Sequence, residues 1–140
     1  MDYEQYRKYF NENSSYLKTI GAEVTVLREG YAEAEIITDE RHRNIHGTVH
    51  GGVFLSLADT VVGAASRSYG RSSVSLEGKL NFMRPVPVDG KPLKAAAKAL
   101  HAGNRTGVYD CQIFSSDGSL AAFGVFTMFM LDKPLECKTE

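Results

Sequence analysis

Aromatic side chains recur at spacings of three and four among polar residues near the start of the chain. They are Tyr3, Tyr6, Tyr9 and Phe10. This spacing predicts a short amphipathic helical segment within residues 1–15, which we expect to pack as a lid. Residues 20–38 then alternate between apolar and polar positions around the turn pair Glu29-Gly30, which predicts a β-hairpin with one solvent-facing side.

The longest helical pattern lies within residues 51–69. Its apolar positions recur at helical spacing and are Phe54, Leu57, Ala58, Val61, Val62 and Ala65. The preceding residues 39–48 are polar and have no periodicity, so we expect a loop there. The pattern therefore predicts one long helix that is entered through a loop.

Strand patterns follow the helix and are separated by short turns. In residues 73–82, one predicted face carries Val74, Leu76, Leu80 and Phe82, and the other carries Ser73, Ser75, Glu77, Lys79 and Asn81. Residues 91–101, 107–115 and 120–131 predict three more strands, with turns at Gly103-Asn104 and Asp117-Gly118. The last strand is apolar at nearly every position, so we expect both of its faces to be covered.

Together these elements predict an α+β fold in which an antiparallel β-sheet wraps around one long central helix. The chain has 140 residues, of which 43% are hydrophobic, enough for one compact core and too few for two. We therefore expect a single domain over residues 1–140. A second subunit can cover the apolar sheet face that remains.

The charge balance argues against several classes of partner. Lys and Arg total 16 and Asp and Glu total 17, so the net charge of −1 provides no field for nucleic acid or an anionic membrane. The two cysteines, Cys111 and Cys137, form neither a disulfide framework nor a CxxC pair. The polar N-terminus does not have the apolar core of a secretion signal, and we expect a cytoplasmic protein.

Asp59 is the one ionisable residue within positions 51–66, and its helical neighbours include Leu55 and Val62. Burying an unpaired carboxylate among such side chains would cost several kcal/mol. We therefore interpret Asp59 as a general base or nucleophile. The alternative is a capped or solvent-exposed helix acid without a chemical role.

Gly51 and Gly52 lie at the predicted start of the same helix, where the first N–H groups have no partner within the helix. Such N–H groups can stabilise an oxyanion, although a plain tight turn would need the same glycines. Gly51 and Asp59 are eight residues apart, or about 12 Å along a helix. If both act on one carbonyl, the site must combine Gly51 of one subunit with Asp59 of its partner.

Other chemistries have weaker support. His42, His46 and His50 are four residues apart, but the glycine and β-branched residues between them favour a loop, so we expect no metal site. His50 is expected to orient the turn or the substrate. The motifs of serine hydrolases, P-loop proteins and dinucleotide-binding folds are absent from the sequence. Lys79, Arg84 and Arg105 can hold phosphates, or they can be ordinary solvated charges.

The residues around the long helix resemble those of one known family. The matching positions are Asn44, the run Gly47-Thr48-Val49-His50-Gly51-Gly52, then Leu57-Ala58-Asp59, and the strand from Ser75 through Asn81-Phe82-Met83-Arg84-Pro85. They resemble the PaaI-like (phenylacetic acid degradation type) hotdog-fold acyl-CoA thioesterases. The resemblance implies a hotdog fold paired as a homodimer, usually as a homotetramer, with acyl-CoA as substrate and no metal or organic cofactor.

The resemblance also implies roles for individual residues. Asp59 would activate water or attack the thioester, with Ser75 positioning the water, and Gly51 N–H, with Asn44 and His50, would polarise the carbonyl from the opposite subunit. Contacts to the rest of the substrate would come from Gly52, Lys79, Asn81, Arg84, Asn104 and Arg105. The resemblance is compatible with an aryl- or a medium-chain acyl-CoA as the substrate. The alternatives are a protein that binds acyl-CoA or an acyl ligand without hydrolysis, and a hydratase on the same fold.

Overall fold

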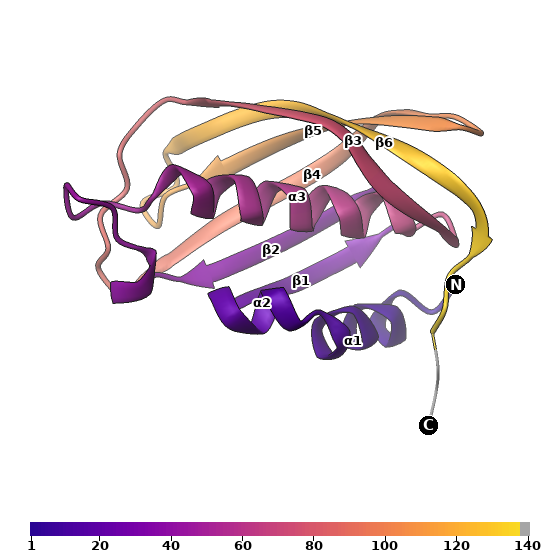
Figure 1. The fold of residues 1–140 in the computed structure, drawn as a ribbon, viewed down its shortest axis with the longest axis horizontal. Coiled ribbons are helices and arrows are strands. Elements are labelled where there is room, and N and C mark those ends of the chain that lie inside the picture. Colours follow the sequence, from indigo (N-terminus) through magenta and orange to yellow (C-terminus); the bar gives the residue numbers. More distant parts are fainter. Residues whose placement is uncertain (138–140) are drawn as a thin grey trace.

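The computed structural model describes residues 1–137. Its elements in chain order are α1 (Tyr3–Asn13), α2 (Ser15–Ile20), β1 (Ala22–Arg28), β2 (Tyr31–Ile37), the 3₁₀ turn η1 (Glu40–His42), α3 (Gly51–Arg67), β3 (Arg71–Phe82), β4 (Pro92–Ala102), β5 (Thr106–Phe114) and β6 (Leu120–Pro134). The strands of this range form one antiparallel sheet in the order β1-β2-β4-β5-β6-β3. Figure 1 shows the sheet curving around α3, with α1 and α2 beside β1. The predicted α+β architecture is therefore confirmed.

The long helix α3 packs its apolar side against the sheet. Leu57, Ala58, Val61 and Val62 have no solvent-exposed surface, and each fully buried leucine or valine contributes about 1.5–3 kcal/mol of hydrophobic stabilisation. The helix begins at Gly51, as the sequence predicts. Burial of this side holds α3 in place and leaves its opposite side, which carries Asp59, accessible.

The N-terminal helical segment is longer than the pattern predicts. Helix α1 ends at Asn13, and a second helix, α2, continues to Ile20 before Gly21 ends it in the left-handed conformation, with φ of 70°. The side chain of Asn11 accepts a hydrogen bond from the Val24 N–H and donates one to the Val24 carbonyl, both at 2.9 Å. Because these backbone groups belong to the outermost strand β1, α1 closes that edge of the sheet.

The predicted faces of β3 are wrong for its first half. Ser73 is buried on the side of α3, whereas Val74 and Leu76 are 45% and 59% exposed. The cause is a β-bulge between Ser75 and Glu77, which shifts the register against β6 and reverses the alternation. Ser75 therefore lies on the same side of the sheet as α3, where the family resemblance places it beside Asp59, and not on the face of Lys79 and Asn81 to which the alternation assigns it.

The outer face of the sheet remains partly apolar. On β6, Phe123 and Val125 are 40% and 47% exposed, although the sequence predicts cover on both faces of this strand. The described chain covers only the face directed toward α3, and cover of the other face, which a second subunit can supply, stays a prediction. Cys111 on β5 is fully buried, as its strand pattern predicts, and burial raises the pKa of its thiol to about 12. No helix in residues 1–137 is long and apolar enough to cross a membrane.

Candidate active site

The first backbone N–H groups of α3 differ in what they bind. The His50 ring accepts a hydrogen bond at Nδ1 from the Gly52 N–H at 2.8 Å, and the His50 carbonyl accepts one from the Val53 N–H at 2.9 Å. Among residues 1–137 the Gly51 N–H has no hydrogen-bond partner. Of the two glycines predicted to contact the substrate through the helix start, only Gly51 can therefore offer its N–H. Gly52 is occupied in capping the helix.

A pocket of about 320 Å³ opens beside Gly51. Its lining residues are Asn44, Thr48, Val49, Gly51, Phe54, Phe82, Met83, Arg84 and Pro85. The rings of Phe54 and Phe82 meet edge to face, with centroids 5.7 Å apart. The pocket thus combines an apolar wall with the free N–H of a helix N-terminus, where negative charge is favoured.

Asn44 is held in the wall of this pocket by its own turn. Its Oδ1 accepts hydrogen bonds from the backbone N–H groups of His46 and Thr48, at 2.9 and 3.0 Å, and its Nδ2 donates to the Thr48 hydroxyl at 2.9 Å. An amide nitrogen carries two hydrogens, and within residues 1–137 the second has no partner. It is a fixed donor beside Gly51.

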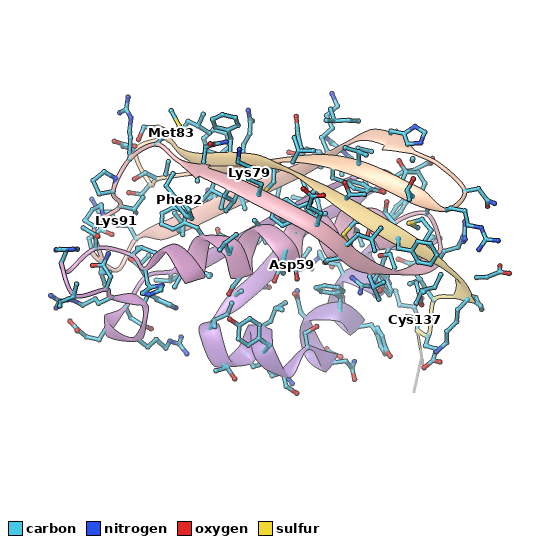
Figure 2. The ribbon with its side chains drawn as sticks, turned by 45° about the horizontal axis from the view of Figure 1, so that its top comes forward. Asp59, Lys79, Phe82, Met83, Lys91 and Cys137 are labelled. Atoms are coloured by element: carbon cyan, nitrogen blue, oxygen red, sulfur yellow. The ribbon has the colours of Figure 1, made fainter. Side chains whose placement is uncertain are left out.

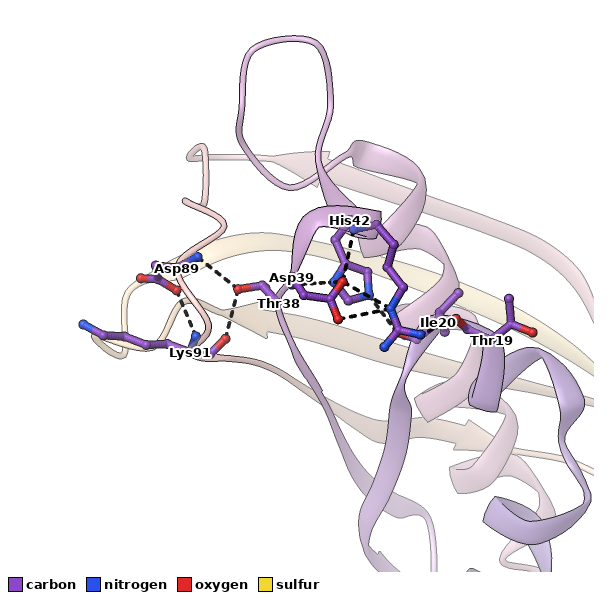
Figure 3. Close-up of polar contacts among 8 residues, drawn as sticks. Thr19, Ile20, Thr38, Asp39, His42, Asp89 and Lys91 are labelled. Carbon is purple, nitrogen blue, oxygen red and sulfur yellow. Dashed lines mark hydrogen bonds and ion pairs between the residues drawn. The ribbon is translucent and has the colours of Figure 1, made fainter.

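The predicted loop before α3 contains the 3₁₀ turn η1, whose last residue, His42, is buried (Figure 3). The ring of His42 accepts a hydrogen bond at Nδ1 from the Asp39 N–H at 2.9 Å and donates one from Nε2 to the Ile20 carbonyl at 2.7 Å. Its own carbonyl accepts a hydrogen bond from the His50 N–H at 2.8 Å. His42 therefore links the end of α2 to the residue that caps α3.

Replacing His42 with alanine should destabilise the fold by about 2–4 kcal/mol, because the cavity adds to the loss of two ring hydrogen bonds. Urea unfolding followed by circular dichroism measures this change in the free energy of unfolding. His46→Ala is the matched control, since His46 is exposed in the same loop, and it should change stability by less than about 0.5 kcal/mol. Equal effects of the two substitutions would contradict the linking role of His42.

Asp59 lies near the middle of α3, and Ser75 on β3 donates a hydrogen bond to its Oδ1 at 2.5 Å. In the single chain this carboxylate is not buried, because Asp59 is exposed and Leu55 beside it is 42% exposed. The physical reason is that the sheet covers only one side of α3. The remaining side is open to solvent or to another subunit.

The structure divides the predicted site residues into groups. Asn44, His50, Gly51, Gly52 and Arg84 gather at the N-terminus of α3, and Asp59 and Ser75 lie along its exposed side. One chain therefore does not bring Gly51 and Asp59 into a single site.

The remaining predicted residues lie elsewhere on the sheet. Lys79 and Asn81 on β3 pair with Val125 and Phe123 on β6, on the face directed away from α3. Figure 2 shows Lys79 on this outer side of the sheet. Asn104 and Arg105 form the exposed turn between β4 and β5, where the Asn104 carbonyl accepts a hydrogen bond from Arg71 at 2.9 Å. Lys79 and Asn81 therefore do not contact the pocket beside Gly51 in the same chain.

The histidine spacing does not produce a cluster of metal ligands. His42 is buried with both ring nitrogens in hydrogen bonds, and His50 caps α3. In the part of the chain that the structure describes, no three His, Cys, Asp or Glu side chains are grouped to hold a metal ion.

Tyr16 is a residue near the site that the sequence pattern does not reveal. It lies on α2, and its hydroxyl is 2.6 Å from that of Ser56, which lies one turn before Asp59 on α3. A helix of six residues is too short for hydrophobic periodicity to register. The available signals were Ser14 and Gly21, residue types typical of helix N-caps and C-caps.

The fold and the His50-Gly51-Gly52 start of α3 can be compared with known proteins. A family model of the thioesterase superfamily matches residues 46–122, and one of a domain of unknown function matches residues 4–76. The acyl-coenzyme A thioesterase PaaI of Escherichia coli K12 is 33% identical over 111 residues, covering 79% of each chain.

Solved structures agree with this comparison. The structure of the E. coli PaaI protein from the phenylacetic acid degradation operon has a TM-score of 0.90 at 28% identity, covering 96% of each chain. A hypothetical thioesterase from Streptococcus pneumoniae, solved with coenzyme A, has a TM-score of 0.82 at 24% identity, covering 91% of this chain and 98% of that one. The chain thus belongs to the thioesterase superfamily, among the PaaI-like hotdog-fold acyl-CoA thioesterases.

Proposed function

We propose that the protein hydrolyses the thioester of an aryl- or medium-chain acyl-CoA at a site shared by two subunits. The observation that carries this proposal is the separation of two half-sites on α3. The free Gly51 N–H lies at the start of the helix, and the Asp59–Ser75 pair lies eight residues later. A thioester carbonyl needs both a nucleophilic oxygen and an oxyanion donor, and a partner subunit can supply the missing half.

The two half-sites divide the chemistry between them. Ser75 binds Asp59 Oδ1, which leaves Oδ2 to remove a proton from water or to attack the thioester carbon. The Ser75 oxygen retains lone pairs that can accept a hydrogen bond from that water. In the partner, Gly51 N–H stabilises the developing oxyanion, supported by the second Nδ2 hydrogen of Asn44 and by His50. Neither route requires a metal or an organic cofactor.

The open edge of the sheet supports a dimer through β3. Asn11 occupies the β1 edge, whereas β3 is the last strand at the other edge and exposes Val74 and Leu76. Antiparallel pairing of two β3 strands around a two-fold axis would extend the sheet across the subunits. With that axis midway between Ser75 and Phe82, Ser75 of one strand would lie opposite Phe82 of the other. Because Ser75 binds Asp59 and Phe82 lines the pocket beside Gly51, each Asp59 would then approach the Gly51 pocket of the partner subunit.

A charge placed on the open edge should separate the subunits. We expect Leu76→Asp to convert the dimer to a monomer and to lower kcat/KM at least about a hundredfold, because each site loses its oxyanion donor. Size-exclusion chromatography with light scattering measures the mass. Leu100→Asp is the matched control, since Leu100 on β4 is 58% exposed and Leu76 is 59% exposed. A fully active Leu76→Asp monomer would contradict the shared site.

The dimer proposed above also indicates which residues hold the coenzyme A part of the substrate. Arg84 lines the pocket beside Gly51, and we propose that it holds CoA phosphates together with the Asn104-Arg105 turn of the partner subunit. The coenzyme A in the streptococcal relative supports this class of ligand.

Lys79 and Asn81 lie on the outer face of the sheet, directed away from α3. They can contact the substrate only if part of the substrate lies over this outer face. Phe123 and Val125 on that face are where a second dimer would pack to form a homotetramer in the cytoplasm.

The test of the proposed function is release of free CoA thiol from a panel of acyl-CoAs. The panel contains acetyl-, hexanoyl-, phenylacetyl-, benzoyl- and palmitoyl-CoA, each assayed across a range of concentrations. We expect turnover of the aryl or medium-chain members to exceed that of the others. Binding without thiol release, detected as an increase in melting temperature, would instead indicate a protein that binds acyl-CoA without hydrolysis.

A further inference from the structure

The exposed side of α3 has a neighbour on each flank of Asp59. On one flank, Ser75 of β3 donates a hydrogen bond to the carboxylate. On the other flank, Ser56 contacts Tyr16 of α2 at 2.6 Å between the two hydroxyl oxygens. Residues three apart on a helix are neighbours, with Cβ atoms about 5–6 Å apart. Asp59 therefore lies between a wall formed by β3 and a wall formed by Tyr16.

The direction of the hydrogen bonds fixes how Tyr16 is held. The Ser56 hydroxyl donates its single hydrogen to the Gly52 carbonyl at 2.9 Å. It therefore accepts from Tyr16, and the phenol is anchored by its oxygen to α3. The tyrosine side chain is still 57% exposed. The anchored residue thus leaves apolar ring surface available close to Asp59.

The aromatic residues of α1 are less suited to contact a substrate. Tyr6 is only 5% exposed, and Tyr3, Tyr9 and Phe10 pack against the hydrophobic core. Among the aromatic residues of the N-terminal helices, Tyr16 of α2 is therefore the one whose exposed ring lies on the same side of α3 as Asp59.

We propose that Tyr16 forms the wall of the acyl-group site opposite β3 and determines which acyl groups are hydrolysed. This inference rests on the proposed function of Asp59. An acyl group whose thioester carbon lies at Asp59 extends along the exposed side of α3, where an aromatic ring or a chain longer than acetyl meets the Tyr16 ring. An acetyl group ends within about 1.5 Å of its carbonyl carbon, a single C–C bond, and does not reach the ring.

The experiment compares kcat/KM for acetyl-, phenylacetyl- and decanoyl-CoA in the native protein and in Tyr16→Ala and Tyr16→Phe. For Tyr16→Ala we expect the ratio of phenylacetyl- to acetyl-CoA to fall about fivefold to tenfold, since an aromatic contact is lost. Tyr16→Phe retains the ring and should keep that ratio within about twofold. Tyr31→Ala is the control, because the Tyr31 hydroxyl binds Glu33 on β2 at 2.6 Å, away from α3, and the ratio should not change.

Two outcomes would overturn the role of Tyr16. One is an unchanged ratio in Tyr16→Ala, and the other is an equal loss on all three substrates, which would indicate a general structural effect. If the native protein hydrolyses none of them, the proposed function fails and Tyr16 is tested by binding alone. In Asp59→Asn, phenylacetyl-CoA should raise the melting temperature more than CoA does, and Tyr16→Ala should remove that difference. A difference that persists would overturn the inference.

Discussion

Asp59→Asn should lower kcat for acyl-CoA hydrolysis by at least a thousandfold, because the amide can neither accept the proton of water nor attack the thioester. Asparagine has nearly the same size and retains an oxygen that accepts the hydrogen bond from Ser75. Substrate binding and folding should therefore change little. Thiol release measures kcat, and the acyl-CoA concentration that half-saturates the melting shift measures binding.

The control for this substitution is a half-buried carboxylate outside the site. Asp110→Asn alters β5 away from α3, and it should retain kcat within about twofold. If Asp59→Asn turned over substrate at the native rate, Asp59 would not be the base or the nucleophile. A loss of folding in Asp59→Asn, seen by circular dichroism, would contradict the expectation that the substitution is confined to chemistry.

Gly51→Pro removes the backbone N–H that we propose stabilises the oxyanion, and we expect kcat to fall about a hundredfold to a thousandfold. Proline suits the first position of a helix, where its absent N–H breaks no helical hydrogen bond. The preceding His50 has φ of −62° and ψ of 138°, a conformation that a following proline favours. The helix should therefore start normally without its donor.

Gly51→Ala separates the loss of the N–H from the addition of a side chain. An added Cβ would lie 3.6 Å from the Phe82 ring, an ordinary contact, and the N–H would remain. We expect Gly51→Ala to retain kcat within about threefold. Equal losses in the alanine and proline variants would show that crowding against Phe82, rather than the missing donor, reduces turnover.

The parts of the fold that the sequence predicts correctly depend on local patterns. The apolar spacing of α3 locates the helix, and its single ionisable residue makes Asp59 a candidate. The orphan N–H groups of any helix start make Gly51 a candidate as well. The distance along a helix separates Gly51 from Asp59 within one chain, as the structure also shows. That one site combines these residues from two subunits stays a proposal.

The parts that could not be predicted depend on irregularities and on tertiary contacts. A bulge after Ser75 reverses the faces of β3, and no alternation of residue types marks its position. The hydrogen bond that occupies the Gly52 N–H depends on how the His50 ring turns. The contact between Tyr16 and Ser56 joins residues 40 positions apart, so it follows only from the folded chain.

The shared site is tested most directly by mixing two inactive variants. Asp59→Asn and Gly51→Pro are unfolded together, refolded as a mixture and assayed for thiol release, with each variant refolded alone as a control. A mixed dimer contains one site with native Asp59 from one subunit and native Gly51 from the other. We predict that the mixture regains about a quarter of native activity, since half of the dimers formed at random are mixed and each has one intact site. Activity no higher than that of the separate variants would contradict a site built across the interface.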